Sequence, residues 1–213
     1  VDGLLQLMGQ AKKDLLIVSP YFVPGPDMKQ AFAAARARGV RVRVLTNSLA
    51  SNDAPIAHAG YARHRPELLA TGLELYEMRS ELSGLRSVFQ GTGSSGVTGS
   101  SGDSKAMLHS KLLILDGRLL VIGSMNLDLR SHLQNTEIAL LIRSRSLSAR
   151  ATEQIEAALE DAAWRVEQDS EGRLVWRAPK DSGLKDATAE PDTSAPLRWL
   201  VRILGWFAPD HLL

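Results

Sequence analysis

Apolar runs of strand length alternate with helix-forming stretches over the N-terminal part of this chain of 213 residues. The pattern predicts the following strands and helices: strands at 14–19, 40–44 and 73–78, and helices at 4–12, 28–38 and 54–71. Strand–helix–strand repeats join parallel strands through helices that cover a sheet. The alternation therefore predicts an α/β fold, with a mixed, largely parallel sheet flanked by helices on both faces.

Local signals mark where some of these elements begin and end. We expect Asp27 to cap the second helix and Gly39 to end it, because these residue types favour those positions. The alternation of apolar and charged residues at 40–44 predicts a half-exposed strand. Pro66 is expected to kink or divide the third helix, since proline removes one helical hydrogen bond.

The C-terminal part continues with further strands and helices. We expect a strand at 137–143, a helix at 147–162 and a closing hairpin at 164–177. Residues 179–195 are polar and predict a linker. A glycine- and serine-rich loop at 91–104 has two open interpretations, a lid over the site or a tolerated insertion.

Composition excludes several classes of protein. Hydrophobic residues make up 44%, which is ordinary for a soluble globular domain. The net charge of +1 gives no overall basic bias, so nucleic acid is not an expected partner. Cysteine is absent, so the chain has no disulfides and no thiol chemistry. The start at Val1 and Asp2, without Met, favours a piece of a longer protein.

Six positions form the spaced pattern H-x-K-x4-D-x6-G-S-x-N: His109, Lys111, Asp116, Gly123, Ser124 and Asn126. Apolar runs at 112–115 and 119–122 flank Asp116 and Gly117, a strong tight-turn pair, and so predict a hairpin. Residues two apart share one face of a strand, so His109 and Lys111 point the same way. The hairpin returns the end of the pattern beside His109, where Gly123 lets a ligand approach the backbone.

These residue types suit attack on a phosphate diester. Neutral imidazole is a good nucleophile near pH 7, which favours His109 as the attacking group. Lys111, Ser124 and Asn126 offer hydrogen-bond donors to phosphate oxygens. No further carboxylate or histidine stands nearby at metal-ligand spacing, so we expect neither a metal nor another cofactor.

The pattern resembles the HKD motif of the phospholipase D superfamily at every position. Glu137 stands where that family has a carboxylate that holds the nucleophilic histidine in its tautomer. The stretches at 18–24, 46–49 and 126–131 resemble the bacterial cardiolipin-synthase branch, and specifically the C-terminal half of a type C-like enzyme. The resemblance covers residues 1–178, which it identifies as a phospholipase D-like half-domain.

The resemblance implies a phosphatidyltransferase that works through a phosphohistidine. Active sites of the superfamily pair two motifs, and this chain carries one. The second half is expected from an upstream region of the same chain, which we favour, or from a homodimer partner. The expected substrate is phospholipid, and the expected location is peripheral, on the cytoplasmic side of the bacterial inner membrane. Two alternatives stay open: a dimeric single-motif phosphodiesterase or nuclease, and a catalytically silent membrane-binding module.

Other residues carry weaker expectations. Asp116 sits at the turn and is expected to brace the hairpin. We expect Arg130 either to reach the edge of the phosphate-binding site or to pair with Asp128. His58 and Tyr61 fall in a segment that resembles a possible channel lining in the cardiolipin-synthase branch, and we expect them to bind substrate; a buried structural histidine is the alternative for His58.

The C-terminal amphipathic segment, residues 196–213, combines arginine with aromatic side chains. Arg198 and Arg202 lie four apart, and Trp199, Trp206 and aliphatic residues cover much of the remaining surface. Such a helix suits the interface of a membrane, with tryptophan at headgroup depth. A helix docked on this domain or on another one is the equal alternative.

Overall fold

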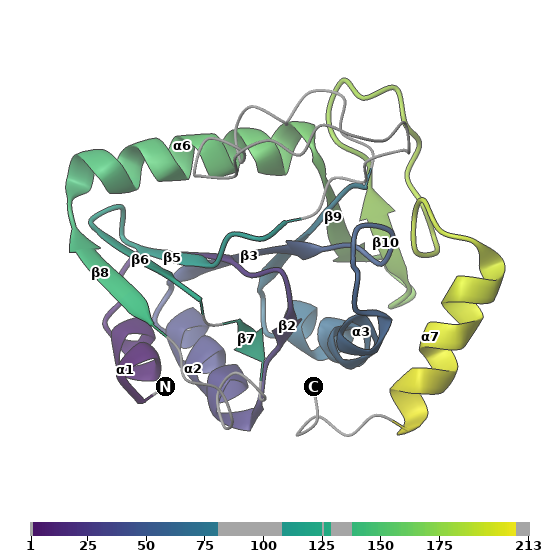
Figure 1. Cartoon of the computed structure of the whole chain (residues 1–213), viewed down its shortest axis with the longest axis horizontal. Coiled ribbons are helices and arrows are strands. Elements are labelled where there is room, and N and C mark those ends of the chain that lie inside the picture. The colour runs from purple at the N-terminus through teal and green to yellow at the C-terminus, as the bar shows by residue number, and fades with distance from the viewer. Residues whose placement is uncertain (1, 81–107, 125, 129–137, 208–213) are drawn as a thin grey trace.

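A computed structural model describes residues 2–80, 108–124, 126–128 and 138–207. Its centre is an eight-stranded sheet in the order β10-β9-β4-β3-β1-β5-β6-β8, with a two-stranded sheet of β2 and β7 beside it (Figure 1). The strands are β1 Asp14–Val18, β2 Phe22–Val23, β3 Arg41–Asn47, β4 Glu74–Met78, β5 Leu112–Leu115, β6 Leu119–Gly123, β7 Leu127–Asp128, β8 Ala139–Arg143, β9 Ala163–Gln168 and β10 Leu174–Arg177. The helices are α1 Asp2–Gly9, α2 Pro26–Ala37, α3 Pro55–Ala70, α6 Arg145–Asp161 and α7 Ala195–Phe207.

The mixed α/β sheet with helices on both faces is confirmed, but parallel pairing is less extensive than the sequence predicted. Only β1 with β3 and β3 with β4 pair in parallel within the large sheet. The other five neighbouring pairs are antiparallel. The helical connections between β1, β3 and β4 produce the parallel part. The remaining strands pair in antiparallel directions. The strand–helix alternation of the N-terminal part therefore did not predict the strand directions in the rest of the chain.

Two apolar layers enclose the sheet. Along β1, Leu15 and Ile17 face one layer, and Leu16 and Val18 face the other, as the period of two along a strand requires. Helices α1, α2 and α3 cover the first layer, while α6 covers the second (Figure 1). No helix in the described part of the chain is both long and apolar enough to cross a bilayer.

Two predicted local features differ in the structure, and Pro66 does not divide its helix. The N-cap of α2 is Gly25, and Asp27 lies in the first turn, where its charge still complements the helix dipole. Strand β3 is buried on both faces because it lies inside the sheet, so the expected half-exposed strand at 40–44 is wrong. Arg43 is accommodated there by ion pairs of 2.9 Å to Asp14 and 2.8 Å to Glu156. Pro66 lies inside α3, which continues through it from Pro55 to Ala70.

Asp116 ties the turn of the β5–β6 hairpin to the start of β1. Its carboxylate accepts hydrogen bonds from the backbone N–H groups of Lys12, Lys13 and Asp14, the shortest at 2.8 Å. Its backbone adopts a left-handed φ of 50°, which aspartate tolerates better than most residues. Burial opposes the charge of Asp116, but the three N–H donors outweigh it and hold the pKa of this carboxyl below its ordinary value.

We expect Asp116→Asn to destabilise the fold by about 1–2 kcal/mol at pH 7, because asparagine keeps the shape but not the charge. A lowered folded-state pKa contributes stability above the ordinary carboxyl pKa, and that stability is lost as pH falls through the folded value. The gap between wild type and variant should therefore shrink as pH falls below the ordinary carboxyl pKa of about 3.9. Urea unfolding across this range measures it. Asp181→Asn, at an exposed site with a left-handed φ of 56°, is the matched control and should change little.

Gly123 closes β6 against the edge strand β8. A Cβ at this position would lie 2.5 Å from the carbonyl oxygen of Ile138 and 3.1 Å from Cα of Ala139. Both neighbours are backbone atoms, which cannot rotate away. The missing Cβ therefore lets strand β8 approach Gly123 closely, while the approach of a ligand to this backbone stays a prediction.

Gly123→Ala should displace β8 and lower the free energy of unfolding by about 1–3 kcal/mol through overpacking. Gly9→Ala is the control, because nothing lies within 4 Å of a Cβ built there. Thermal and urea unfolding of the two variants compare the effects. Equal stability of both variants would show that β8 yields without cost.

Candidate active site

The β5–β6 hairpin brings the two ends of the motif together, as predicted. The strands pair in antiparallel register from Leu112 with Ile122 to Leu115 with Leu119. The N–H of Gly123 donates to the carbonyl of Lys111 at 3.1 Å. Strand β5 also pairs with β1, and this end of it lies beside Val18. The motif thus sits at the carboxyl edge of the parallel strands, where open α/β sheets commonly bind ligands.

His109 is exposed at this edge, and the backbone around it is held by two side chains. Lys111 Nζ donates to the carbonyl oxygen of His109 at 3.1 Å. Asn47, at the end of β3, accepts from the N–H of Leu108 at 2.9 Å and donates to the carbonyl of Leu108 at 3.2 Å. Its amide also donates to the carbonyl of Pro20 at 3.3 Å. Asn47 thereby fixes the residue directly before His109.

Asn47 is a positioning residue that the sequence reasoning missed. It was noted only as part of the stretch 46–49 that resembles the cardiolipin-synthase branch. The available signal was an amide residue directly after a strongly apolar strand, where an unpaired buried side chain would be costly. Its partner Leu108 lies 61 positions away, so no local pattern pointed to the pairing.

Ser124 and Asn126 follow the second strand of the hairpin. The backbone N–H of Ser124 donates to the carbonyl of Ile138 at 3.0 Å, and its Oγ accepts from the N–H of Ile138 at 3.1 Å. Oδ1 of Asn126 is buried and has no hydrogen-bond partner among the described residues. The chain then returns to β2, where the N–H of Leu127 donates to Oγ of Ser19 at 3.0 Å.

Several predicted residues are not brought to this edge or lie beyond the described residues. Asp116 stands at the opposite end of β5 and holds the α1–β1 connection, so it braces the hairpin without entering the site. Glu137, Arg130 and the loop at 91–104 lie outside the described residues, and their roles remain predictions.

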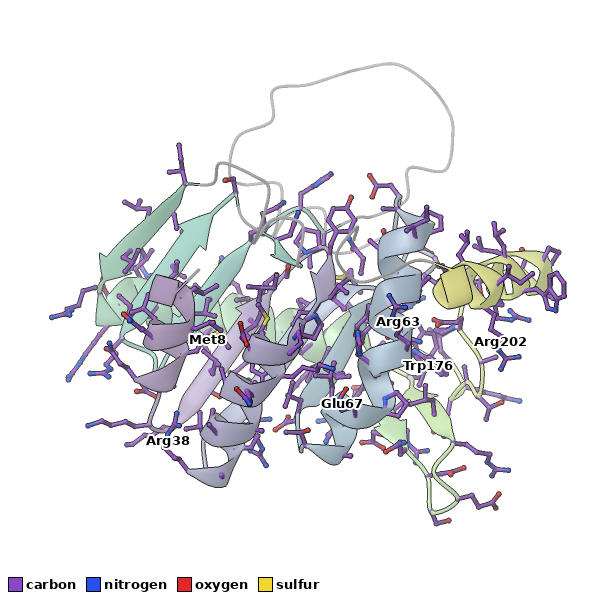
Figure 2. All side chains as sticks on the ribbon, turned by 90° about the horizontal axis from the view of Figure 1, so that it is seen from below. Met8, Arg38, Arg63, Glu67, Trp176 and Arg202 are labelled. Atoms are coloured by element: carbon purple, nitrogen blue, oxygen red, sulfur yellow. The ribbon has the colours of Figure 1, made fainter. Side chains whose placement is uncertain are left out.

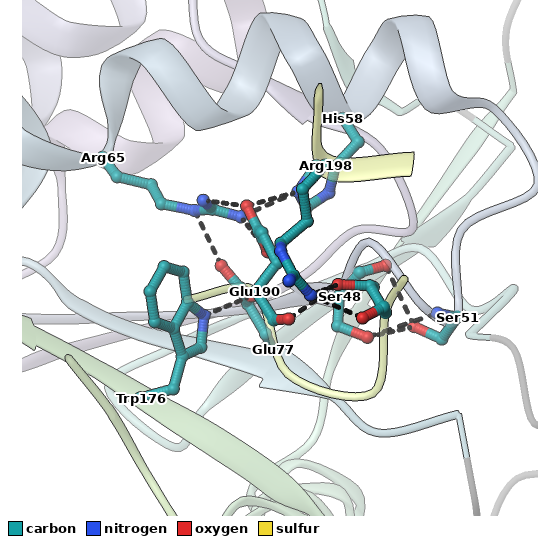
Figure 3. A network of polar contacts seen from close by, with 9 residues as sticks. Ser48, Ser51, His58, Arg65, Glu77, Trp176, Glu190 and Arg198 are labelled. Carbon is teal, nitrogen blue, oxygen red and sulfur yellow. Dashed lines mark hydrogen bonds and ion pairs between the residues drawn. The ribbon is translucent and has the colours of Figure 1, made fainter. Parts of the chain in front are cut away.

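His58 and Tyr61 are buried inside the domain, with 1% and 2% of their surfaces exposed, which does not support their expected role in substrate binding. Nε2 of His58 lies 2.8 Å from Nη2 of Arg65 and 3.2 Å from Glu190 (Figure 3). The guanidinium of Arg65 lies 4.7 Å from the centroid of the Tyr61 ring. Both residues therefore stabilise a polar network, which matches the structural alternative for His58.

Arg65 is the centre of this network. It pairs with Glu77 at 2.8 Å and with Glu190 at 2.5 Å, and Trp176 Nε1 donates to Glu77 at 2.8 Å (Figure 3). Burial raises the pKa of Glu77, against the opposing charge of Arg65. Burial disfavours the charge of Glu190 as well, but Arg65 and His58 hold the pKa of Glu190 well below its ordinary value.

The segment predicted as a linker, 179–195, is part of the domain. Its Glu190 completes the buried network, and Ala187 pairs with Trp176 through two backbone hydrogen bonds of 2.8 and 2.9 Å. The polar composition of this segment predicted a linker. Arg65, the partner of Glu190, lies 125 residues away, so no local pattern indicated the contact.

Within the described part of the chain, no three His, Cys, Asp or Glu residues cluster as a metal site would require.

We expect Asn47→Ala to loosen the backbone before His109. Thr46→Val is the matched control, because the Thr46 hydroxyl also donates to the carbonyl of Pro20 but does not contact Leu108. Amide hydrogen exchange at Leu108 should accelerate about tenfold more in Asn47→Ala than global stability explains, and should stay near wild type in Thr46→Val. Equal exchange in the two variants would show that Asn47 does not fix this backbone.

Comparisons with known proteins agree with this geometry. Residues 4–159 match the family described as cardiolipin synthase, PLD-like domain. Cardiolipin synthase C of Escherichia coli (strain K12) is 38% identical over 99% of this chain and 43% of its own length. Cardiolipin synthase A of Pectobacterium carotovorum is 31% identical over 66% of this chain and 24% of its own length. The chain thus spans less than half of these relatives.

Solved structures share the fold at low sequence identity. Phosphatidylserine synthase of Haemophilus influenzae gives a TM-score of 0.63 at 17% identity, over 98% of this chain and 43% of that protein. Nuc, a phospholipase D family member of Salmonella typhimurium, gives 0.55 at 20% identity, over 78% of this chain and 90% of that protein. Together with the family match over residues 4–159, these findings show that the chain belongs to the cardiolipin synthase family with a phospholipase D-like domain.

Proposed function

We propose that this chain supplies one half of the active site of a phospholipase D-type phosphatidyltransferase of the cardiolipin-synthase class. One observation carries the proposal: the N–H of Gly123 bonds the carbonyl of Lys111, and His109 is exposed at the same end of the β5–β6 hairpin. The family match supports the choice of a phosphatidyl group over other phosphate diesters. The enzyme would act peripherally at the cytoplasmic side of the bacterial inner membrane, where its phospholipid substrates lie.

His109 would act as the nucleophile or as the general acid facing it. As nucleophile, its neutral ring nitrogen attacks phosphorus and forms a P–N bond while the bond from phosphorus to the leaving alcohol breaks. The histidine of the other half then gives its proton to that alcohol. A second alcohol, such as phosphatidylglycerol, transfers its proton to that histidine and displaces His109 from phosphorus.

Neighbouring groups would hold the phosphate during both steps. Lys111 has three N–H donors, of which one reaches the backbone carbonyl of His109, so its amine lies beside the backbone of that residue. Asn126 lies at the same end of the hairpin, and the N–H groups of its side-chain amide would donate to a phosphate oxygen. Glu137, directly before Ile138, would orient the ring of His109 through its other nitrogen. The Lys111 ammonium and the Asn126 amide would stabilise the charge that develops on the phosphate oxygens.

An exposed apolar strip beside the motif supports a missing second half. Ile122 and Leu140 form a cross-strand pair on β6 and β8 and are 42% and 60% exposed, and Ile138, two residues before Leu140, is 78% exposed. Edge strands normally avoid such exposure because their open backbone invites pairing with another chain. A second phospholipase D-like half would cover this strip and bring its own motif opposite His109.

We favour an upstream region of the same polypeptide as the source of that half, because this chain spans only 43% of the E. coli relative. A homodimer is the second candidate, and the match over 90% of Nuc, a phospholipase D family member, favours it. The mass of the active species in solution separates the two: a homodimer of this chain that turns over a simple diester would exclude the need for an upstream half.

His109→Asn should lower transfer of labelled phosphatidyl groups by at least about a thousandfold in the enzyme that contains both halves. Arg118→Ala, exposed at the far end of the same hairpin, is the control and should retain activity. Quenching during turnover should trap labelled protein in the wild type. Wild-type turnover by His109→Asn would refute the role of His109. Vesicle binding without diester turnover in the two-half enzyme would instead favour a catalytically silent membrane-binding module.

A further inference from the structure

The side-chain amide of Asn47 brings the backbone of Tyr21 close to that of His109. The amide nitrogen donates to the carbonyl of Pro20 at 3.3 Å and to the carbonyl of Leu108 at 3.2 Å. These two carbonyls belong to the peptide groups that lead into Tyr21 and His109, so the backbone of both residues lies beside the same nitrogen. Tyr21 is half-buried at this edge, and His109 is exposed.

The other end of the motif also lies beside Tyr21. Strands β2 and β7 pair in parallel, with Phe22 opposite Leu127. Tyr21 and Asn126 directly precede these two residues, so they enter the paired strands side by side. Oγ of Ser19 joins the two segments, because it accepts from the N–H of Leu127 and donates to the carbonyl of Tyr21. Tyr21 therefore neighbours both ends of the motif.

A carboxylate from the connection between β3 and α3 meets Tyr21 at this edge. The phenol of Tyr21 donates a hydrogen bond to Oδ1 of Asp53. Two residues earlier, Oγ of Ser51 donates to the carbonyl of Met78 at 2.9 Å and lies 3.4 Å from Oδ1 of Asn47. These contacts hold the connection against the end of the sheet, so the exposed side chain of Asp53 lies beside the motif.

A carboxylate at this place does not suit a phosphate. An ionised carboxylate only accepts hydrogen bonds, and the oxygens of a phosphate diester have none to donate. Within the described ranges, Oδ2 of Asp53 has no hydrogen-bond partner, so it is able to accept from a ligand. The hydrogen-bond donor that a phosphatidyl transfer brings to phosphorus is an alcohol. A hydroxyl of that alcohol that does not react keeps its proton and can donate to a carboxylate.

We propose that Asp53 selects alcohols that carry a second hydroxyl next to the one that reacts, and that Tyr21 positions its carboxylate. This role rests on the proposed function, since the alcohol is the one that displaces His109 from phosphorus. The reacting hydroxyl gives its proton to the histidine of the other half and forms the new bond to phosphorus. The neighbouring hydroxyl donates a hydrogen bond to Asp53, where no covalent bond forms or breaks. Asp53 is thus a specificity-determining residue, and Tyr21 is a positioning residue.

A competition between two alcohols tests the proposal in the enzyme that contains both halves. Propylene glycol and n-propanol each offer a primary hydroxyl, and they differ by one further hydroxyl on the neighbouring carbon. With labelled phospholipid and equal concentrations of the two alcohols, the wild type should form the glycol product about tenfold faster, as one hydrogen bond to a charged group allows. Asp53→Ala should abolish most of this preference, and Tyr21→Phe should lower it about threefold.

Glu67→Ala is the matched control, because it removes an exposed carboxylate near the other end of α3. In Figure 2, Arg63 lies above Glu67 on α3, so the helix descends from the end that Asp53 precedes. Glu67 pairs with Lys29 at 2.8 Å on the surface, where an ion pair contributes little stability. Its product ratio should equal that of the wild type. Since both products form in one reaction, partial unfolding of a variant does not change the ratio.

An unchanged product ratio in Asp53→Ala would overturn the proposal, because a purely structural role of Asp53 would slow both products equally. Equal use of the two alcohols by the wild type would do the same. Hydrolysis of the phospholipid without transfer to either alcohol would also overturn it, while the chemistry proposed for His109 would stand. Absence of both hydrolysis and transfer in the wild type would instead refute the proposed function, and the role of Asp53 with it.

Discussion

The placement of the motif depends on one constraint: β5 is held at both of its ends by buried or partly buried polar side chains of other elements. Asp116 draws the hairpin turn onto the backbone at the start of β1, and Asn47 binds the backbone of Leu108 at the other end. Between these two ends, the apolar residues of β5 pair with those of β1. The reaction proposed for His109 needs a fixed approach to the substrate, and these two clamps would provide it.

A second polar cluster extends the domain past its last strand. Burying Arg65 is costly unless its charge is compensated, and Glu77 and Glu190 together compensate it. Because Glu190 belongs to the segment before α7, the same network fixes where that helix begins. An apolar cluster of Leu197, Val201 and Leu204 with Leu49 and Ala59 then determines which face of α7 packs on the domain.

Much of the fold and part of the site followed from local patterns. The hairpin at 112–123 was predictable because two apolar runs flank Asp116 and Gly117, and the hairpin then required the two ends of the motif to meet. The prediction of a half-exposed β3 was wrong, and the close approach of β8 to Gly123 was not predicted, for a shared reason. Whether a strand is central, or whether a glycine faces a neighbouring backbone, depends on strand order, and strand order has no local signature.

The sequence by itself determined the α/β class, the hairpin and the residues of the motif, because periodicity and turn chemistry act over a few neighbouring positions. Tertiary structure alone decided that His58 and Tyr61 are buried supports, that Asn47 holds the backbone beside His109, and that Glu190 belongs to the core. Each of these outcomes joins groups from separate elements. A buried charge or amide is stable only with its distant partner in place, and folding is the step that brings that partner within hydrogen-bond range.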